Sequence, residues 1–395
     1  MLYFKYKDNV FRTVQKANIC IVGPSKRFLS GISYYTIRIA NALSDSNNVS
    51  VICFRKLLPE FLFPGRRHVG RNISHIDFNP NVRVFDGMDY NNPLTWYSAY
   101  RYLNRSKPDV IIMQWWTSSV SHMLLFLKIV GYFMKSKLII EFHEVIDPME
   151  EAFLPLRLYS GFMGRLLRKN AQAYITHSEP DKKLIAARYG ILPEKIHVIP
   201  HGLYDQYERI NKKTAREKLK IDDEFVILSF GLIRRYKGIP YLIKAFEQLP
   251  EIISGKTRLL IVGEVWEDKK ELIDIVHSSP LKDKITLIDR YVEDSEVSLF
   301  FSAADIIVLP YLRVSQSGVA HIAMTFGKPI IVSDVQGLRE SMGGYEGAFF
   351  VPPGNSESIT KEIIIHLGTQ EIYNPPTIGW DIISRKYLEI ISKKV

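Results

Sequence analysis

A short turn at residues 231–238, GLIRRYKG, carries three cations whose types and spacing suit the binding of an anion. Arg234, Arg235 and Lys237 follow an apolar run, and a helical pattern begins beside them. Cations this close repel one another unless an anion neutralises them, and the N-terminus of a helix also favours negative charge. Arginine offers paired donors to phosphate oxygens and lysine a point charge. The turn therefore predicts a diphosphate site, with a solvated basic turn as the alternative.

A second turn lies within residues 314–329, VSQSGVAHIAMTFGKP, between an apolar run and a short helical pattern. Serine and glycine at the start of a helix leave backbone N–H groups free to point at a phosphate. Plain capping of that helix would explain the same residues. The residues that we assign here to donor binding are Ser315, Gln316, Ser317, Gly318 and Val319.

A third turn, GPSKRFLSGI at residues 23–32, separates the first apolar run from the first helical pattern. Its glycines, among them Gly31, allow close approach of the backbone to an anion, and Lys26 and Arg27 add positive charge. The spacing is not the GxGxxG of dinucleotide sites, so a dinucleotide is not the expected ligand. An ordinary strand-to-helix turn is the alternative.

A histidine flanked by acids ends another apolar run, in EFHEVID at residues 141–147. Ligands of doubly wound folds bind beyond the carboxyl ends of the strands, so His143 is a candidate general base or sugar-contacting residue, with Glu144 beside it. A structural histidine is the alternative. Trp115 and Trp116 end a neighbouring run, where they would either stack on a sugar or acceptor or, as is commoner, pack in the core.

The positive charge of the chain is concentrated in its first half. The formal net charge is +10, and residues 1–200 hold 27 Lys and Arg against 15 Asp and Glu, whereas residues 201–395 hold 25 against 27. Such asymmetry suggests that the first half meets something anionic. At helical spacing, residues 155–169 place cations on one arc and apolar side chains on much of the rest, as in helices that lie on an anionic membrane. A crossover helix packed on a sheet is the alternative.

The sequence also excludes several classes of protein. Its 46% hydrophobic and 24% charged residues are typical of globular proteins, and no apolar run reaches the ~20 residues that span a bilayer. The histidines are scattered along the chain and no Asp-x-Asp turn would hold Mg²⁺ against a diphosphate, so we expect no metal and no other cofactor. No nucleic-acid recognition motif appears, and we expect no such partner. Two cysteines and a charged N-terminus indicate a reducing, cytoplasmic location.

Short apolar runs alternate with helical patterns of ~10–15 residues, which is the rhythm of parallel sheets with crossover helices. The rhythm pauses at the polar stretch 201–214 and then restarts. We therefore predict an α/β protein of two Rossmann-like, doubly wound domains facing each other across a cleft, at residues 1–202 and 203–379. The predicted strands are 18–23, 49–53, 109–113, 138–142, 171–176, 225–230, 258–263, 285–288, 305–309 and 329–333.

Taken together, these segments resemble the retaining glycosyltransferases of family 4, which have the GT-B fold. The segment SGI followed by IRIANAL is similar to the glycine turn and first helix of the family, and GLIRRYKGIPYLIKAF is similar to its phosphate loop. DRYVEDSEVSLFFSAADIIVLPY and FGKPIIVSDVQGLRE resemble the segments on either side of the donor motif, and KIHVIPHG and VPPGN also fit. The order and spacing of the segments make the resemblance specific over nearly the whole chain.

The resemblance implies that residues 1–202 bind the acceptor, that residues 203–379 bind a nucleotide-diphosphate sugar, and that a last helix at 380–395 crosses back to the first domain. It implies transfer of a sugar with retention of configuration and without a metal ion. It also places His143 beside the donor sugar and matches Lys237 to a conserved lysine. Arg234 or Arg235, together with Lys237, would stabilise the charge that builds on the leaving diphosphate. His143, Arg235 and Lys237 are therefore the expected catalytic residues.

The chain departs from the family pattern at two glutamates, whose places are taken by Val314 and Ile322. Those glutamates grip hydroxyl groups of the donor, so Gln316 or His321 would have to substitute for them. Leu232 also stands where the family has an arginine, a role that Arg234 or Arg235 would cover. These departures leave the identity of the donor open.

Three functions follow from the sequence. The leading one is a hexosyltransferase that extends a glycan or lipid-linked acceptor, in contact with the inner face of an anionic membrane through residues 155–169. The second is a nucleotide-sugar epimerase on the same fold, which would need no acceptor. The third is a GT-B binding subunit without catalysis, which the missing glutamates motivate.

Overall fold

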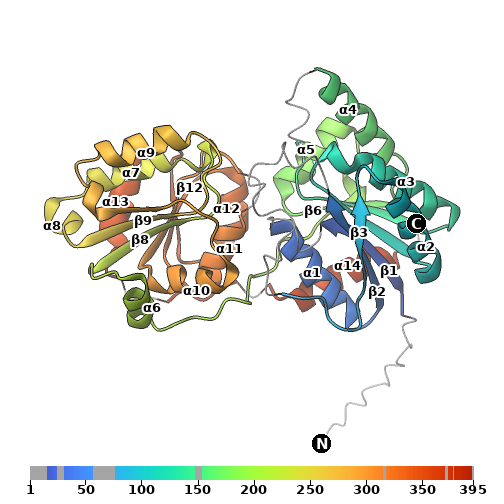
Figure 1. Ribbon diagram of the computed structural model, residues 1–395, viewed down its shortest axis with the longest axis horizontal. Helices are drawn as coiled ribbons and strands as arrows, with labels where there is room; N and C mark the ends of the chain where they lie inside the picture. The colour runs from blue at the N-terminus through green and yellow to red at the C-terminus, as the bar shows by residue number, and fades with distance from the viewer. Residues whose placement is uncertain are drawn as a thin grey trace, which may run out of the picture.

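The computed structural model of the chain describes residues 16–24, 31–56, 76–146, 154–314, 317–369, 372–376 and 378–393. Two separate sheets, each purely parallel, form the cores of two domains, which are the two lobes of Figure 1. Helices cover both faces of each sheet. The architecture is therefore the predicted pair of doubly wound α/β domains.

The N-terminal sheet has the strand order β3-β2-β1-β4-β5-β6-β7. Successive side chains of β1 enter different cores, because Ile19 and Ile21 pack on one face of the sheet and Cys20 and Val22 on the other. The chain order reverses between β1 and β4, which is where ligands of doubly wound folds bind. The strands are β1 (Asn18–Pro24), β2 (Asn48–Lys56), β3 (Arg83–Asp89), β4 (Val110–Trp115), β5 (Lys137–Phe142), β6 (Ala173–Thr176) and β7 (Ile196–Val198).

The C-terminal sheet has the order β10-β9-β8-β11-β12-β13, with its reversal between β8 and β11. Its central strands are continuous apolar runs because both of their faces are buried. The strands are β8 (Phe225–Phe230), β9 (Thr257–Val262), β10 (Ile285–Ile288), β11 (Ile306–Leu309), β12 (Ile330–Ser333) and β13 (Ala348–Val351).

The crossover helices follow the strands in sequence. Those of the N-terminal domain are α1 (Gly31–Ser44), α2 (Pro93–Ser106), α3 (Ser121–Phe133), α4 (Leu154–Arg168) and α5 (Glu179–Tyr189). Residues 199–211, between β7 and α6, form a linker without helix or strand. The helices after it are α6 (Lys212–Leu219), α7 (Ile239–Glu247), α8 (Glu251–Ser254), α9 (Lys269–Ser278), α10 (Asp294–Ala303), α11 (Gly318–Thr325), α12 (Gln336–Met342), α13 (Ser356–His366) and α14 (Trp380–Ser392). Short 3-10 turns occupy Ser118–Val120, Pro193–Lys195, Arg235–Lys237 and Lys282–Lys284.

The last helix, α14, packs against α1 of the N-terminal domain rather than against the domain that precedes it in sequence (Figure 1). Its inward face is apolar, with Ile383 and Tyr387 fully buried. The indole N–H of Trp380 donates a hydrogen bond to the carbonyl of Leu203 over 3.0 Å. At the other end, the ammonium of Lys137 on β5 donates to the carbonyl of Ile391 over 3.3 Å. The helix is therefore part of the N-terminal core.

In the described ranges, no helix has the length and apolar character that crossing a bilayer requires. Lys128 interrupts the apolar sequence of α3 for a local reason. Its ammonium donates hydrogen bonds to the carbonyls of Leu166 and Leu167, at 2.6 and 3.0 Å, near the C-terminus of α4. A cation there satisfies carbonyls that have no partner within the helix and favours the negative end of its dipole.

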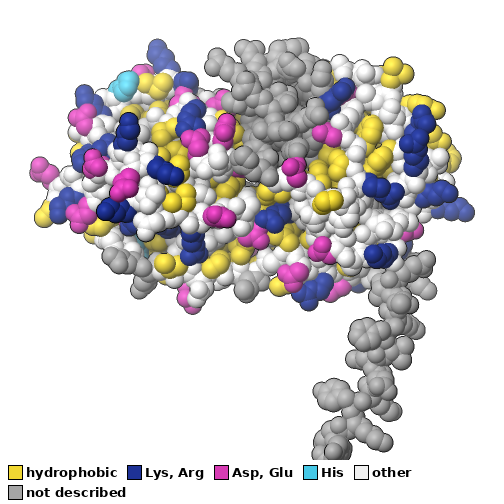
Figure 2. Space-filling model, turned by 60° about the horizontal axis from the view of Figure 1, so that its bottom comes forward, with side chains coloured by type: hydrophobic (Ala, Val, Ile, Leu, Met, Phe, Trp, Pro, Cys, Tyr) yellow, Lys and Arg dark blue, Asp and Glu magenta, His cyan; other side chains and the backbone are white. Residues whose placement is uncertain are grey.

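The uneven charge of the sequence is visible on the molecular surface. On the face drawn in Figure 2, Lys and Arg side chains gather on the outer flank of the N-terminal lobe, whereas cations and anions are intermingled over the C-terminal lobe. On this face, the described cations of the N-terminal half therefore lie on the surface of one domain.

Candidate functional site

Two glycines shape the predicted basic turn, which follows β8. Gly231 has φ +101° and Gly238 has φ +66°, a region of backbone conformation that favours glycine. A Cβ atom on Gly238 would lie 2.0 Å from the carbonyl oxygen of Pro310, just after β11. The N–H of Leu312 also donates to the carbonyl of Tyr236 over 2.8 Å. The turns after β8 and β11 therefore form one surface at the reversal point of the sheet.

Lys237 is directed into this surface. The residue is only 9% exposed, and its ammonium donates a hydrogen bond to the phenol oxygen of Tyr311. Burial lowers the pKa of Lys237 to about 8, and the positive charge of Arg234 contributes in the same direction. Among the described residues, no carboxylate lies within ion-pair distance of Lys237. The Nζ atom lies 4.0 Å from the position that a Cβ atom on Gly231 would occupy, so a buried cation faces bare backbone here.

Arg235 is not crowded beside Lys237, contrary to the sequence prediction. The Arg235 guanidinium donates to both carboxylate oxygens of Asp268 over 2.8 Å, and its side chain is 76% exposed. The Arg234 guanidinium lies over the ring of Trp266, 4.6 Å from its centroid. Because Asp268 neutralises Arg235 at the surface, the structure does not place Arg235 where a diphosphate held by Lys237 would be. The expectation of three clustered cations is therefore corrected for Arg235.

The N-terminus of α11 lies on the other side of Gly231. Ser317 caps this helix, because its hydroxyl oxygen accepts a hydrogen bond from the N–H of Ala320 over 3.3 Å. Val319 touches the position that a Cβ atom on Gly231 would take, at 2.9 Å. The first N–H groups of a helix have no partner within it, so the start of α11 and Lys237 offer anion-binding groups on both sides of Gly231. Ser315 and Gln316 lie outside the described residues.

The N-terminal domain meets α11 at its first turn. A Cβ atom on Gly318 would lie 3.0 Å from the phenol oxygen of Tyr204, a residue of the linker. The ring of Tyr204 in turn stacks on that of Tyr34 of α1, with 4.3 Å between the centroids. The stacked pair of Tyr204 and Tyr34 therefore connects the start of α11 to α1, the first helix of the N-terminal domain.

The two positions where the resemblance expects glutamates are apolar and packed. Val314 is partly buried against the core and Ile322 is only 7% exposed. His321, beside Ile322, is also buried, and its Nε2 atom has no hydrogen-bond partner in the part of the chain that the structure describes. Its ring lies 5.8 Å from that of His201, between centroids, on the N-terminal side of the domain boundary.

His143 is buried directly beyond the end of β5. Its Nδ1 atom lies 3.2 Å from Nε2 of His177. Its Nε2 atom, which has no hydrogen-bond partner in the described ranges, lies 3.7 Å from a carboxylate oxygen of Glu141. His177 Nδ1 lies 2.9 Å from the carbonyl of Ile199, so this nitrogen carries the proton and Nε2 of neutral His177 accepts. Burial lowers the pKa of His177 to about 4, helped by the nearby His143. The uncharged His177 therefore orients His143.

Glu141 is fully buried at the centre of this network. Burial alone would raise its pKa, but His143, His177 and the hydrogen bond from Tyr387 together lower it to about 2. Gln114 of β4 donates to the same carboxylate over 3.2 Å, and the phenol of Tyr387 donates to it from α14. The carboxylate is therefore ionised, and three elements of the N-terminal domain are joined through it.

The remaining predicted residues lie at different depths. Trp115 is 2% exposed in the core of the N-terminal sheet, so it is a packing residue and offers no face to a sugar. Trp116 is partly buried and packs 6.0 Å from the ring of Phe54, between centroids. Glu144 is exposed, and it adds to the effect of burial in raising the pKa of Tyr236, so it lies within electrostatic reach of the basic turn. Gly31 begins α1, and the turn before it lies outside the described residues.

Sequence reasoning missed four residues of this site, namely His177, His201, Tyr311 and Tyr387. A signal for two of them was present, because His177 and His201 each come shortly after an apolar strand, as His143 does. The three strands that precede them, β5, β6 and β7, are neighbours in the sheet. Tyr311 likewise follows β11. Tyr387 carried no such signal, because it reaches the site from a helix distant in sequence.

The predicted basic helix, residues 155–169, is largely α4 and is exposed along one side. Leu158 and Phe162 are each 64% exposed, and Arg165 and Lys169 are exposed beside them. Phe133, at the end of the neighbouring helix α3, is 79% exposed. A pocket of about 720 Å³ adjoins α4, and its cationic lining residues are Arg157, Arg165, Arg168, Lys169, Arg188 and Lys195.

Comparison with known proteins agrees with this arrangement. Residues 29–206 match the family model described as Glycosyltransferase Family 4, and residues 211–374 match the model described as Glycosyl transferases group 1. The crystal structure of Anabaena HepE in complex with UDP superimposes with a TM-score of 0.68 at 18% identity, over 96% of this chain and all of that one. The chain therefore belongs to the family 4, group 1 glycosyltransferases and has the GT-B fold.

Two curated relatives are similar over part of the chain. An uncharacterised glycosyltransferase of Methanocaldococcus jannaschii is 25% identical over 234 residues, which is 55% of this chain and 58% of the relative. The lipopolysaccharide 1,2-N-acetylglucosaminetransferase of Salmonella typhimurium is 24% identical over 259 residues, which is 62% of this chain and 66% of that enzyme. The chain thus spans about six tenths of the length of these relatives.

Proposed function

We propose that this protein transfers a hexose from a nucleotide-diphosphate sugar to a glycan or lipid-linked acceptor, with retention of configuration. The observation that carries the proposal is the buried ammonium of Lys237, which faces Gly231 beside the N-terminus of α11 without a carboxylate partner in the described structure. A buried cation is costly unless it is paired, so a bound diphosphate would supply the missing negative charge.

In this proposal, groups of the protein alone stabilise the negative charge of the leaving diphosphate. Lys237 and the first N–H groups of α11 would stabilise it, with Arg234 turning from Trp266 to assist. No divalent ion is needed at the diphosphate, because these groups replace the charge that Mg²⁺ would otherwise provide. Arg235 has no part in this mechanism, since Asp268 already neutralises it.

His143 would face the sugar from the N-terminal domain. His177 holds the Nδ1 side of the ring, and Nε2 has no hydrogen-bond partner among the residues that the structure describes. Nε2 would contact a hydroxyl group of the sugar. The buried Glu141 carboxylate would stabilise the ring if the ring took the proton of the acceptor hydroxyl as an oxocarbenium-like transition state formed.

The exposed side of α4 would bring the acceptor side of the enzyme to an anionic membrane. Its apolar residues would enter the interface while Arg165 and Lys169 meet lipid phosphates. The resulting location is the inner face of the cytoplasmic membrane, where a lipid-linked acceptor is present. The Salmonella relative, a lipopolysaccharide transferase, is consistent with such an acceptor.

The first experiment is thermal stabilisation by UDP, GDP, ADP and dTDP, each with and without EDTA. A nucleotide at ~100 times its Kd adds about 2.7 kcal/mol to the stability of the folded state. We expect one nucleotide to stabilise the protein selectively and equally with EDTA, and its sugar ester to be turned over only when an acceptor is present. Turnover of the sugar nucleotide alone would indicate an epimerase. No response to any nucleotide would contradict the proposal and favour a binding subunit, as the apolar Val314 and Ile322 suggest.

A further inference from the structure

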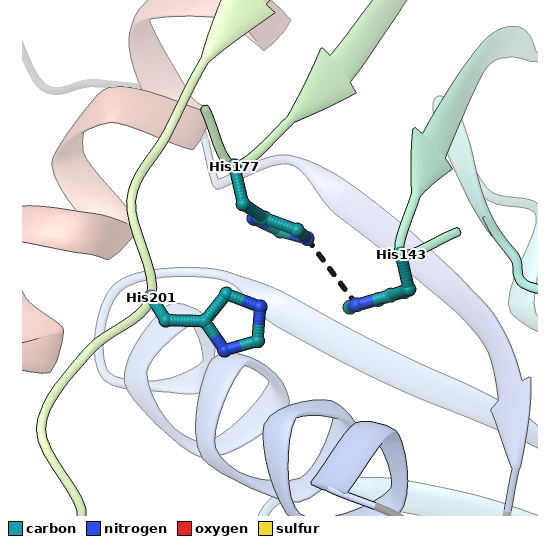
Figure 3. Close-up of side chains that lie close together, drawn as sticks. All are labelled: His143, His177 and His201. Carbon is teal, nitrogen blue, oxygen red and sulfur yellow. Dashed lines mark hydrogen bonds between the residues drawn. The ribbon is translucent and has the colours of Figure 1, made fainter. Parts of the chain in front are cut away.

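Three histidines meet at one edge of the N-terminal sheet (Figure 3). His143 directly follows β5, His177 directly follows β6, and His201 lies three residues beyond β7. Because these parallel strands are neighbours, their carboxyl ends deliver the three side chains to the same place. Figure 3 shows the three rings turned toward a common space between the chain segments.

The nitrogen atoms are close enough to share an ion. One ligand atom from each of the three residues lies within 4.8 Å of the others, and Nδ1 of His143 lies 3.2 Å from Nε2 of His177. Two nitrogens that bind one tetrahedral Zn²⁺ at 2.0–2.1 Å are roughly 3.3 Å apart, so the His143–His177 pair already has the required spacing. His201 is only partly buried, and its ring needs to move by up to about 1.5 Å to bring its nitrogen from within 4.8 Å to this spacing.

The groups that orient metal-binding histidines are also in place. Such histidines donate their other ring N–H to a carbonyl or a carboxylate, which fixes the tautomer. His177 has the carbonyl of Ile199 at 2.9 Å from Nδ1, so its Nε2 is free to bind an ion. His143 has a carboxylate oxygen of Glu141 at 3.7 Å from Nε2, so binding through Nδ1 would place the Nε2 proton toward that carboxylate.

The contact between His143 and His177 leaves a place for an ion. It joins two ring nitrogens, Nδ1 of His143 and Nε2 of His177, so a proton or a cation has to lie between them. A bound cation would take the place of that proton. Nε2 of His143, which is buried with no hydrogen-bond partner among the described residues, could then carry a proton toward the Glu141 carboxylate, 3.7 Å away.

We propose that His143, His177 and His201 bind one divalent transition-metal ion of the zinc type, with Glu141 as the carboxylate that orients His143. Imidazole nitrogens favour Zn²⁺, Co²⁺ and Ni²⁺ over Mg²⁺, so this site is not a diphosphate-bridging Mg²⁺ site. It lies on the N-terminal sheet, whereas Lys237 and α11 belong to the C-terminal domain. The ion and the sugar contact of the proposed function would share His143, but metal binding is measured without any nucleotide, so the two proposals can fail separately.

The test is a titration of the untagged, metal-free protein with Co²⁺, followed by visible absorption, and with Zn²⁺, followed by thermal unfolding. We expect one Co²⁺ per chain with the strong absorption of a tetrahedral nitrogen site, displacement of Co²⁺ by Zn²⁺, and a rise in Tm with Zn²⁺ but not with Mg²⁺. The His177→Gln and His201→Gln variants should bind at least tenfold more weakly. His277→Gln, at an exposed histidine of α9, is the matched control and should bind as the parent does.

Glu141→Gln tests the orienting carboxylate, and a 10- to 100-fold loss of Zn²⁺ affinity is expected. If His177→Gln does not fold, the metal titration of His201→Gln is the test, since replacing the partly buried His201 leaves the His143–His177 contact intact. Absence of Co²⁺ binding by the folded parent would overturn the proposal. Equal affinity in His201→Gln and the parent would also overturn it, because the ion would then lie elsewhere.

Discussion

The phenol of Tyr387 donates a hydrogen bond to the carboxylate of Glu141, across 246 residues of sequence. Both groups are fully buried, and the Tyr387 hydroxyl also lies 2.9 Å from that of Tyr35 on α1. A helix that follows the C-terminal domain therefore supplies a partner to the buried carboxylate beside His143 and His177. This contact makes α14 a part of the site as well as a part of the N-terminal core.

Replacement of Tyr387 by phenylalanine should measure this contact. The variant keeps the ring but leaves the ionised Glu141 with one donor fewer, so the free energy of unfolding should fall by about 1.5–3 kcal/mol. Chemical denaturation at pH 7 would check this value. Tyr132→Phe, at an exposed tyrosine of α3, should leave stability unchanged. Equal stability of Tyr387→Phe and the parent would show that Gln114 and the histidines satisfy the carboxylate alone.

The basic turn yields a prediction that separates its cations. Lys237→Ala should abolish nucleotide binding with little loss of stability, because it removes the buried cation that faces Gly231. Arg235→Ala should bind nucleotide nearly as the parent does, because Arg235 is paired with Asp268 and exposed. Calorimetric titration with the nucleotide that stabilises the parent would measure both. Unchanged affinity in Lys237→Ala would remove Lys237 from the donor site.

Nucleotide affinity should also depend on pH through Lys237. The pKa of free Lys237 is lowered to about 8, chiefly by burial, and a bound diphosphate would raise it again. Binding therefore takes up a proton above pH 8, and affinity should fall there by up to about tenfold per pH unit. In Lys237→Arg the charge persists at high pH, so the affinity should no longer fall between pH 8 and 9.5. An identical fall in that variant would assign the proton to another group.

His143→Ala should separate donor binding from transfer. The residue lies in the N-terminal domain, so nucleotide affinity should stay within about twofold, while the rate of sugar transfer should fall by roughly 10² to 10⁴. The comparison needs a transfer assay with saturating nucleotide sugar and a binding titration on the same preparation. Turnover close to that of the parent would make His143 a structural residue.

If α4 contacts a membrane, charges placed on its exposed side should weaken the binding of the protein to lipid vesicles. Leu158→Asp and Phe162→Asp place a charge on two side chains that are 64% exposed, and binding to vesicles of phosphatidylglycerol should weaken at least tenfold. Ile252→Asp, on the exposed side of α8 in the other domain, should bind vesicles as the parent does. Co-sedimentation at low and physiological salt would distinguish apolar insertion from simple charge attraction.

The interior strands were predictable because burial on both faces demands continuous apolar runs, as in β1 and β4. The three strands that the prediction missed, β3, β7 and β13, are all at sheet edges. An edge strand needs no unbroken apolar run, and β3 accordingly carries Arg83 and Asp86. Charged residues therefore hid β3, whereas β10, an edge strand with the mostly apolar run ITLI, was predicted.

The site was predictable in the same uneven way. The basic turn and His143 follow strong strands directly, so local pattern was enough to find them. The ion pair of Arg235 could not be predicted, because its partner Asp268 lies in the turn after β9, distant in sequence. The gathering of His143, His177 and His201 was not predictable either, because three scattered histidines become neighbours only once the strand order is known. Local sequence reports which residues end strands, whereas topology decides which of those ends meet.

The position of α14 has a consequence for synthesis of the chain on the ribosome. The N-terminal sheet is translated first, yet Ile383 and Tyr387, which complete one of its cores, are translated after the whole C-terminal domain. Until then the side of α1 that α14 covers is exposed, and Glu141 lacks the hydrogen bond from Tyr387. The domain that begins to fold first is therefore finished last, and a nascent chain exposes apolar surface that chaperones would recognise throughout that interval.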